Sequence, residues 1–131
     1  TGGTITGVSN YLKEQRSVYS VAVEPEDSPV ISGGEPGPHM IQGIGAGFVP
    51  KNFDRASIDE VFTIPTKEAI MMAQVLAEKE GLFCGISAAA NVYAALQVAQ
   101  RDEFKDQRVV TILCDSGERY LSMNLFEEGV K

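Results

Sequence analysis

Glycine and threonine residues at the start of the chain form a pattern suited to binding an anion, Thr1-Gly2-Gly3-Thr4. Glycines let the backbone approach an anion closely and direct several N–H groups at it. The threonine hydroxyls add neutral donors, and a helix after the turn would add its positive N-terminal end. The pattern predicts a phosphate site that needs no lysine, although four residues taken alone are more typical of an ordinary glycine turn.

A second glycine-rich stretch, residues 42–48 (QGIGAGF), places three glycines at alternate positions among small apolar residues. Such a backbone can pack tightly against a flat ring or a small substrate. It is equally typical of a mobile loop whose glycines take positive φ angles. The two interpretations are about even on the residues alone.

Two further polar groups stand next to predicted elements. Ser87 precedes a predicted helix, where a plain N-cap is the ordinary interpretation and a functional hydroxyl in a pocket of small residues is the alternative. Residues 114–122 (CDSGERYLS) follow a predicted strand, and the carboxyl ends of parallel strands are where α/β proteins build their sites. In the alternative, Glu118 and Arg119 make ordinary surface ion pairs.

Other residues with chemical potential receive no catalytic role. His39, the only histidine, has no carboxylate or serine at useful spacing, so we expect it to be structural. No spacing typical of a metal site occurs. Met71 and Met72 are expected to fill the core.

Strands alternate with helices along the chain, with a loop rich in glycine and proline from 27 to 50. The predicted strands are 18–23, 61–64 and 109–114, and the predicted helices are 7–15, 67–80 and 88–100. This order predicts an α/β fold with a mainly parallel sheet. The apolar run 109–114 predicts a strand covered on both faces.

Local signals refine the two longer helices. Thr66 is expected to cap the first of them and Gly81 to end it. The residues expected on its buried side are Ala69, Met72, Val75 and Leu76. The stripe expected to be buried on the second is Val92, Ala95, Leu96 and Ala99.

Composition limits the classes of partner. The chain has 131 residues and a net charge of −7, which argues against binding nucleic acid or an anionic membrane surface. No apolar run is long enough to span a bilayer. Cys84 and Cys114 lie in apolar runs and are expected to be buried free thiols, which favours a cytoplasmic location.

The four segments, in this order and over essentially the whole chain, resemble the cysteine synthase (O-acetylserine sulfhydrylase) family and its relative cystathionine β-synthase. Residues 1–4 are similar to the end of that family's phosphate loop, and residues 37–48 to its substrate-side loop. Ser87 matches the serine that hydrogen-bonds the cofactor's pyridine nitrogen, and residues 116–122 are similar to the closing signature. The resemblance implies an α/β fold of type II pyridoxal-phosphate enzymes (tryptophan synthase β-like), with residues 1–131 as the C-terminal portion of the cofactor-binding domain.

The resemblance also implies pyridoxal 5′-phosphate as cofactor and a β-replacement, in which O-acetylserine loses acetate and sulfide takes its place. A neutral serine at the ring nitrogen cannot stabilise a positive charge there, which favours elimination over transamination. The cofactor-binding residues implied are Thr1, Gly2, Gly3, Thr4 and Ser87. The substrate-binding residues implied are Gly43, Ile44, Gly45 and Ala46.

Some positions depart from the family pattern. Ala88 and Ala89 replace a serine and a glycine, and Cys114 replaces a proline. Because Cys114-Asp115 is reminiscent of the branch nearer the second isozyme and cystathionine β-synthase, sulfide and homocysteine both stay open as the nucleophile.

The family's Schiff-base lysine lies far upstream of the matched segments. None of the lysines in the chain stands in a matching motif: Lys13, Lys51, Lys67, Lys79, Lys105 and Lys131. We therefore expect the chain to contain no catalytic residue and to be inactive alone. The opening glycine turn, with no strand before it, indicates a piece of a larger enzyme, which should expose a sheet edge and apolar surface.

The resemblance implies a homodimer acting on small molecules. In this family the active-site cleft can also accept the C-terminal tail of serine acetyltransferase. The alternative function from another class is therefore a chain that binds this tail and does not catalyse.

Overall fold

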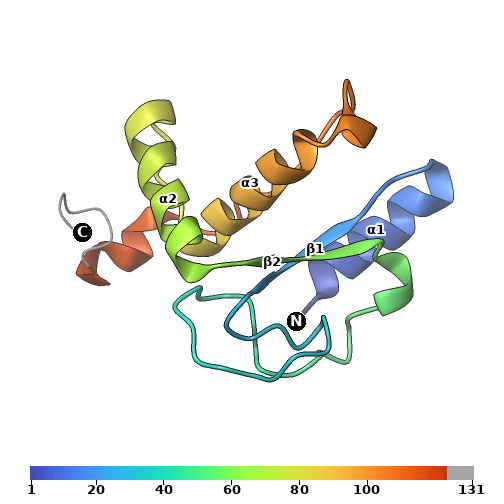
Figure 1. Ribbon diagram of the computed structural model, residues 1–131, viewed down its shortest axis with the longest axis horizontal. Coiled ribbons are helices and arrows are strands. Elements are labelled where there is room, and N and C mark those ends of the chain that lie inside the picture. Colours follow the sequence, from blue (N-terminus) through green and yellow to red (C-terminus); the bar gives the residue numbers. More distant parts are fainter. Residues whose placement is uncertain (124–131) are drawn as a thin grey trace.

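The computed structural model describes residues 1–123. Along the chain lie the helix α1 (Gly3–Gln15), the strands β1 (Val21–Pro25) and β2 (Glu60–Ile64), and the helices α2 (Thr66–Glu80) and α3 (Ile86–Ala99). Short 3-10 turns cover Arg55–Ser57, Asp102–Phe104 and Gly117–Met123. In Figure 1 the two strands lie between α1 on one side and α2 and α3 on the other.

The sheet of the described residues is a parallel pair, which confirms the predicted α/β class. Its register runs from Val21 opposite Glu60 to Pro25 opposite Ile64. The prediction of a strand over 18–23 was shifted toward the N-terminus. The Ser20 N–H donates to the Asp59 carboxylate at 2.7 Å, so a side chain takes the place of a strand neighbour just before β1.

Helix ends follow local signals only in part. Gly81 ends α2 with a φ of 67°, as predicted. The prediction that Thr66 is the cap was wrong, because Thr66 is the first helical residue and its hydroxyl donates to Asp27 Oδ2 at 2.9 Å. The first helix begins at Gly3 rather than at residue 7, so the opening glycine turn is itself the start of α1.

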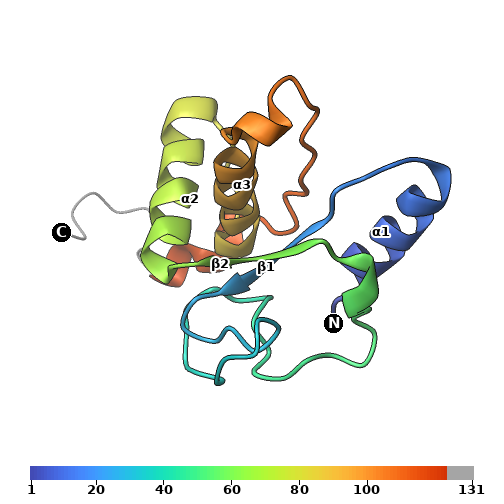
Figure 2. The ribbon, with the colours of Figure 1, turned by 45° about the vertical axis from the view of Figure 1, so that its right-hand side comes forward.

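Alanines, together with Leu76 of α2, form the buried contact between α2 and α3, which pack against each other (Figure 2). Ala73 of α2 and Ala88 and Ala89 of α3 belong to one buried cluster. The predicted stripe on α3 was wrong in part, since Leu96 is 46% exposed while Ala94 and Val98 are buried. Small side chains let two helix backbones approach closely, so they take the inner positions.

The larger apolar residues of α2 also depart from expectation. Val75 and Met71 are exposed, whereas the predicted Ala69 and Leu76 are buried. Met72 is partly buried against the α2–α3 cluster, so only this methionine of the pair contributes to the core.

The predicted buried strand over 109–114 is the largest correction. Within the described residues this segment pairs with no strand, and Val110 is 80% exposed. Cys114 is exposed as well, so only Cys84 is buried as predicted, although both are free thiols. An apolar run indicates that a segment is suited to a buried strand, but a strand also needs a neighbouring strand to pair with. The exposed apolar surface that we expected includes this segment.

Candidate functional site

Three stretches that are distant in sequence meet around one cavity at the start of α3. The cavity has a volume of about 270 Å³. Its walls come from the glycine loop, from the first turn of α3 and from the segment after residue 113. The lining residues are Gln42, Gly43, Ser87, Cys114, Asp115, Arg119 and Tyr120.

Ser87 lies in the first turn of α3 rather than at its N-cap, so the plain capping role does not apply. The residue is 3% exposed, and its Oγ lies 3.3 Å from the Sγ of Cys114, where either atom can donate. Gly43 faces this hydroxyl: a Cβ built on Gly43 would lie 3.5 Å from Ser87 Oγ. Gly43 has a φ of 96°, a backbone conformation that favours glycine.

The His39 ring holds the rest of the glycine loop in place through two hydrogen bonds to its backbone. Its Nδ1 accepts the Ile41 N–H at 3.2 Å, and its Nε2 lies 2.7 Å from the Gly45 carbonyl oxygen. An accepting Nδ1 leaves the proton on Nε2, which therefore donates to Gly45. His39 is thus structural, as expected, and it ties two turns of the loop together.

The loop residues predicted to contact substrate separate into two groups. Gly43 lines the cavity, whereas residues 44–46 are not among its described lining residues. Ile44 packs instead against the core cluster that contains the fully buried Ile41. Gly45 faces the His39 ring and Pro25.

Asp115 is the functional-site residue that sequence reasoning missed. Its Oδ1 accepts the Ala88 N–H at 2.9 Å, and its Oδ2 accepts the Tyr120 hydroxyl at 2.5 Å. Burial, followed by this hydrogen bond and the charge of Asp115, raises the pKa of Tyr120 to about 12. Residues 114–122 were recognised as a site segment, but no local signal links Asp115 to a helix 27 residues earlier.

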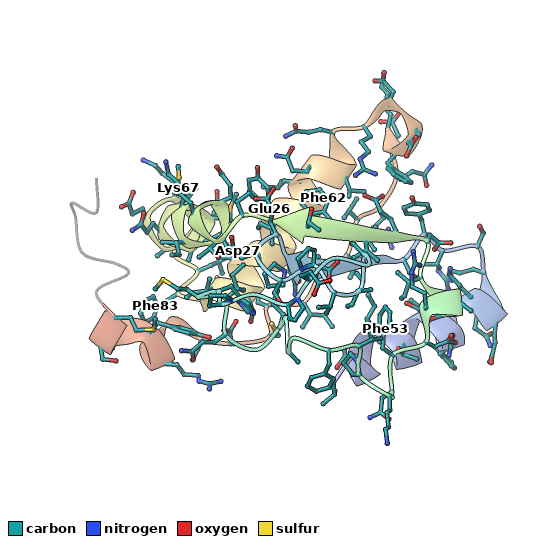
Figure 3. All side chains as sticks on the ribbon, turned by 60° about the horizontal axis from the view of Figure 1, so that its bottom comes forward. Glu26, Asp27, Phe53, Phe62, Lys67 and Phe83 are labelled. Carbon is teal, nitrogen blue, oxygen red and sulfur yellow. The ribbon has the colours of Figure 1, made fainter. Side chains whose placement is uncertain are left out.

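The turn that follows Asp115 is anchored to the link between α2 and α3. The Gly117 N–H donates to the Phe83 carbonyl oxygen at 3.1 Å, and a bridge pairs Cys84 with Ser116. Figure 3 shows Phe83 beside this C-terminal turn. The side chain of Glu118 accepts from Ser116 Oγ at 2.6 Å.

The opening turn, residues 1–4, packs against Phe53 and lies apart from the residues that line the cavity. Gly2 has a φ of 71° and packs on Phe53, which Figure 3 places beside α1. The Gly3 N–H donates to Thr1 Oγ1 at 3.3 Å, and the Asp54 N–H donates to Thr6 Oγ1 at 3.0 Å. Residues 1–4 are not among the described residues that line the cavity around Ser87. Their part in binding a phosphate stays a prediction.

Residues 1–123 contain no group of three or more His, Cys, Asp or Glu side chains placed to hold a metal ion. In the same part of the chain, no helix combines the length and apolar character that crossing a bilayer requires. Of the lysines named above, Lys131 lies outside the described residues.

Comparison with known proteins gives a consistent result. Residues 1–115 match the protein family described as "Pyridoxal-phosphate dependent enzyme". A cysteine synthase of Buchnera aphidicola (subspecies Acyrthosiphon pisum) is 50% identical over 137 residues, covering 98% of this chain. The chain spans 44% of the length of that relative.

Solved structures superpose on nearly the whole chain. The crystal structure of cysteine synthase (OASS) from Entamoeba histolytica is 40% identical with a TM-score of 0.95, covering 99% of this chain and 39% of that one. The O-acetylserine-dependent cystathionine β-synthase of Helicobacter pylori is 44% identical with a TM-score of 0.85, covering 92% of this chain and 39% of that one.

Proposed function

We propose that this chain, which belongs to the family of pyridoxal-phosphate-dependent enzymes, is the C-terminal, cofactor-anchoring portion of a cysteine synthase. Its α/β fold is fold type II of that family. The proposed reaction replaces the acetate of O-acetylserine by sulfide to give cysteine. The observation that carries the proposal is the likeness of almost the entire chain to cysteine synthases, in sequence and in structure.

The residues around the cavity fit the ring end of pyridoxal phosphate. Ser87 offers a hydroxyl that is almost fully buried and that contacts the thiol of Cys114, a weak hydrogen-bonding group that a ring nitrogen can replace. A Cβ at Gly43 would come within 3.5 Å of that hydroxyl and narrow the space in front of it. When bound, the cofactor supplies an electron sink for negative charge that develops on the substrate.

The neutral character of Ser87 sets the chemistry that the site favours. A hydroxyl can hydrogen-bond an unprotonated ring nitrogen but cannot compensate a positive charge on it, as a carboxylate would. Among the described residues that line the cavity, the one carboxylate is Asp115, and it already accepts hydrogen bonds from Ala88 and Tyr120. A bound ring would therefore stay a modest electron sink, which suits elimination and replacement at the substrate β-carbon.

The phosphate and the substrate are assigned to the two glycine segments. Thr1, Gly2, Gly3 and Thr4 would hold the phosphate through backbone N–H groups and hydroxyls at the start of α1, where the helix dipole favours an anion. Gly43 with residues 44–46 would form the substrate side, where the His39 hydrogen bond to Gly45 keeps the backbone in place.

The complete enzyme is proposed to act as a cytoplasmic homodimer and to contain the Schiff-base lysine in a part that this chain does not include. The chain alone is then expected to be inactive. Binding of a serine acetyltransferase tail in the same cleft remains the proposed partner interaction.

Cystathionine β-synthase activity is a second candidate, favoured by one specific observation. A solved relative with 44% identity is an O-acetylserine-dependent cystathionine β-synthase. Such an enzyme would use homocysteine in place of sulfide, with the same cofactor and the same leaving group.

The experiment is an assay of the full-length protein that carries this sequence, with O-acetylserine and either sulfide or homocysteine. We expect cysteine formation with sulfide to exceed cystathionine formation in kcat/KM. The variant Ser87→Ala should lower the rate with either nucleophile. Turnover with homocysteine alone would favour the second candidate, and no turnover with either in a cofactor-loaded protein would contradict both.

A further inference from the structure

The first turn of α3 is capped by a side chain from another part of the chain. Its N-cap residue is Gly85, which has no side chain that could cap the helix. Instead, the Ala88 N–H donates to Asp115 Oδ1 at 2.9 Å and the Gly85 N–H donates to the Asp115 carbonyl oxygen at 3.0 Å. A carboxylate at a helix N-terminus satisfies free N–H groups and interacts favourably with the helix dipole.

The Asp115 carboxylate is itself held by the core. Its second oxygen accepts the hydroxyl of Tyr120, which is 1% exposed and belongs to the cluster containing Ile41 and Ile86. A Cβ at Gly85 would overlap both the carboxylate and the Tyr120 ring, so this close approach requires a glycine. The carboxylate therefore has little freedom to move.

Ser87 lies in the chain between Gly85 and Ala88, whose N–H groups both donate to Asp115. It is flanked by Ile86 of the core and by Ala88, which Asp115 binds directly. Its hydroxyl contacts Cys114, the residue before Asp115, at 3.3 Å. The Ala88 N–H next to Ser87 and the Cys114 thiol, at 2.9 and 3.8 Å, thus both donate to the same carboxylate oxygen, Asp115 Oδ1.

We propose that Asp115 is a positioning residue that fixes the hydroxyl of Ser87 in the cavity by joining the first turn of α3 to the segment 114–120. The inference rests on the proposed function, because it concerns the ring end of the cofactor that Ser87 would contact. Asp115 itself does not need to contact the cofactor for this role.

Removing the carboxylate should leave the helix start uncapped and let Ser87 sample other orientations. Loss of an N-cap costs about a factor of five in the population of an ordered first turn. We therefore expect Asp115→Ala to weaken pyridoxal-phosphate binding roughly fivefold. It should also shift the absorption and fluorescence bands of the bound cofactor in the same direction as Ser87→Ala.

Conservative variants separate positioning from general damage. Asp115→Asn keeps an oxygen for the Ala88 N–H and should bind the cofactor within about twofold of the wild type. Tyr120→Phe removes the hydroxyl that holds Oδ2, so its effect should lie between those of the other two. Asp27→Ala is the matched control, because Asp27 also bonds the first residue of a helix, Thr66, but does not line the cavity.

The test measures pyridoxal-phosphate affinity and cofactor spectra in the full-length protein, with thermal unfolding of each apoprotein in parallel. Asp115→Ala and Ser87→Ala should be non-additive: the double variant should bind no more weakly than Ser87→Ala alone, because Asp115 acts through Ser87. If Asp115→Ala fails to fold, the same comparison is made with Tyr120→Phe.

Two results would overturn the inference: unchanged affinity and spectra in Asp115→Ala, or effects of the two substitutions that multiply. If Ser87→Ala weakens binding and Asp115→Ala does not, the inference fails and the proposed function stands. If the wild-type full-length protein binds no pyridoxal phosphate, the proposed function fails and the inference falls with it.

Discussion

The Nε2 atom of His39 lies 2.7 Å from the carbonyl oxygen of Gly45, and this hydrogen bond joins two turns of the long loop between β1 and β2. The same ring accepts the N–H of Ile41, which is fully buried in the core. The imidazole therefore links the glycine backbone next to the cavity to an anchored residue. A loop that lacks regular secondary structure gains its order from such contacts.

Replacing His39 by alanine should loosen this loop without unfolding the helices. Two hydrogen bonds are lost, and each is worth about 0.5–1.5 kcal/mol in unfolding free energy. Limited proteolysis and amide exchange should show faster cleavage and faster exchange in residues 40–47. The variant His39→Gln keeps a donor for Gly45, so its cleavage and exchange rates should lie between those of the wild type and of His39→Ala. Unchanged protection in His39→Ala would show that the ring does not order the loop.

Gly45 should tolerate a methyl group less well than another glycine of the same loop. Its φ is 64°, and a Cβ there would lie 2.5 Å from His39 Nε2 and 2.6 Å from Pro25. Gly33 also has a positive φ, 90°, but a Cβ there meets nothing within 4 Å. Gly33→Ala should therefore cost about 1 kcal/mol for backbone strain, and Gly45→Ala should cost about 1–3 kcal/mol more for overpacking. If Gly33→Ala and Gly45→Ala lost equal stability in urea unfolding, the close packing of Gly45 against His39 and Pro25 would be contradicted.

The sequence could predict the helices, the two paired strands and the three segments that meet at the cavity, because these depend on local patterns. Gly81 ends a helix through its own φ, and Val61 to Ile64 form a strand as their composition suggests. The predictions that failed are those that depend on which distant segment a residue contacts. Residues 109–114 have the composition of a buried strand but lack a neighbour in the described chain, and Asp115 caps a helix 27 residues earlier.

The buried face of the alanine-rich helix α3 could not be predicted from its sequence either. The helix is apolar around most of its circumference, so a period of hydrophobic residues does not identify one face. Burial depends on the neighbouring elements: Ala88 and Ala89 are buried in the cluster shared with α2, Ala90 is buried in the cluster that contains Ile41, and Leu96 is exposed.

The two cysteines should differ strongly in their rate of reaction with a disulfide reagent. Burial, reinforced by the charge of Asp115, raises the pKa of Cys84, and the residue is 4% exposed. Cys114 is exposed at the cavity. Because the thiolate is the reactive form, Cys114 should react at least about tenfold faster with a disulfide reagent near pH 8. Mass spectrometry of labelled peptides measures both rates, and Cys114→Ser should remove the fast phase. A fast phase that persists in Cys114→Ser would contradict the burial of Cys84.

Tyr120 should be the last tyrosine of the described chain to ionise. Burial, the hydrogen bond to Asp115 and the charge of that carboxylate raise its pKa to about 12, whereas an unfolded tyrosine titrates near 10. A raised pKa in the folded state means that the neutral phenol stabilises the fold. This stabilisation is fully present below pH 10 and is lost as the pH rises through about 12. Phenolate absorbance measured against pH should show a late step that Tyr120→Phe abolishes and that Asp115→Asn moves to lower pH. A single step near pH 10 for every tyrosine would show that the Asp115–Tyr120 hydrogen bond does not persist in solution.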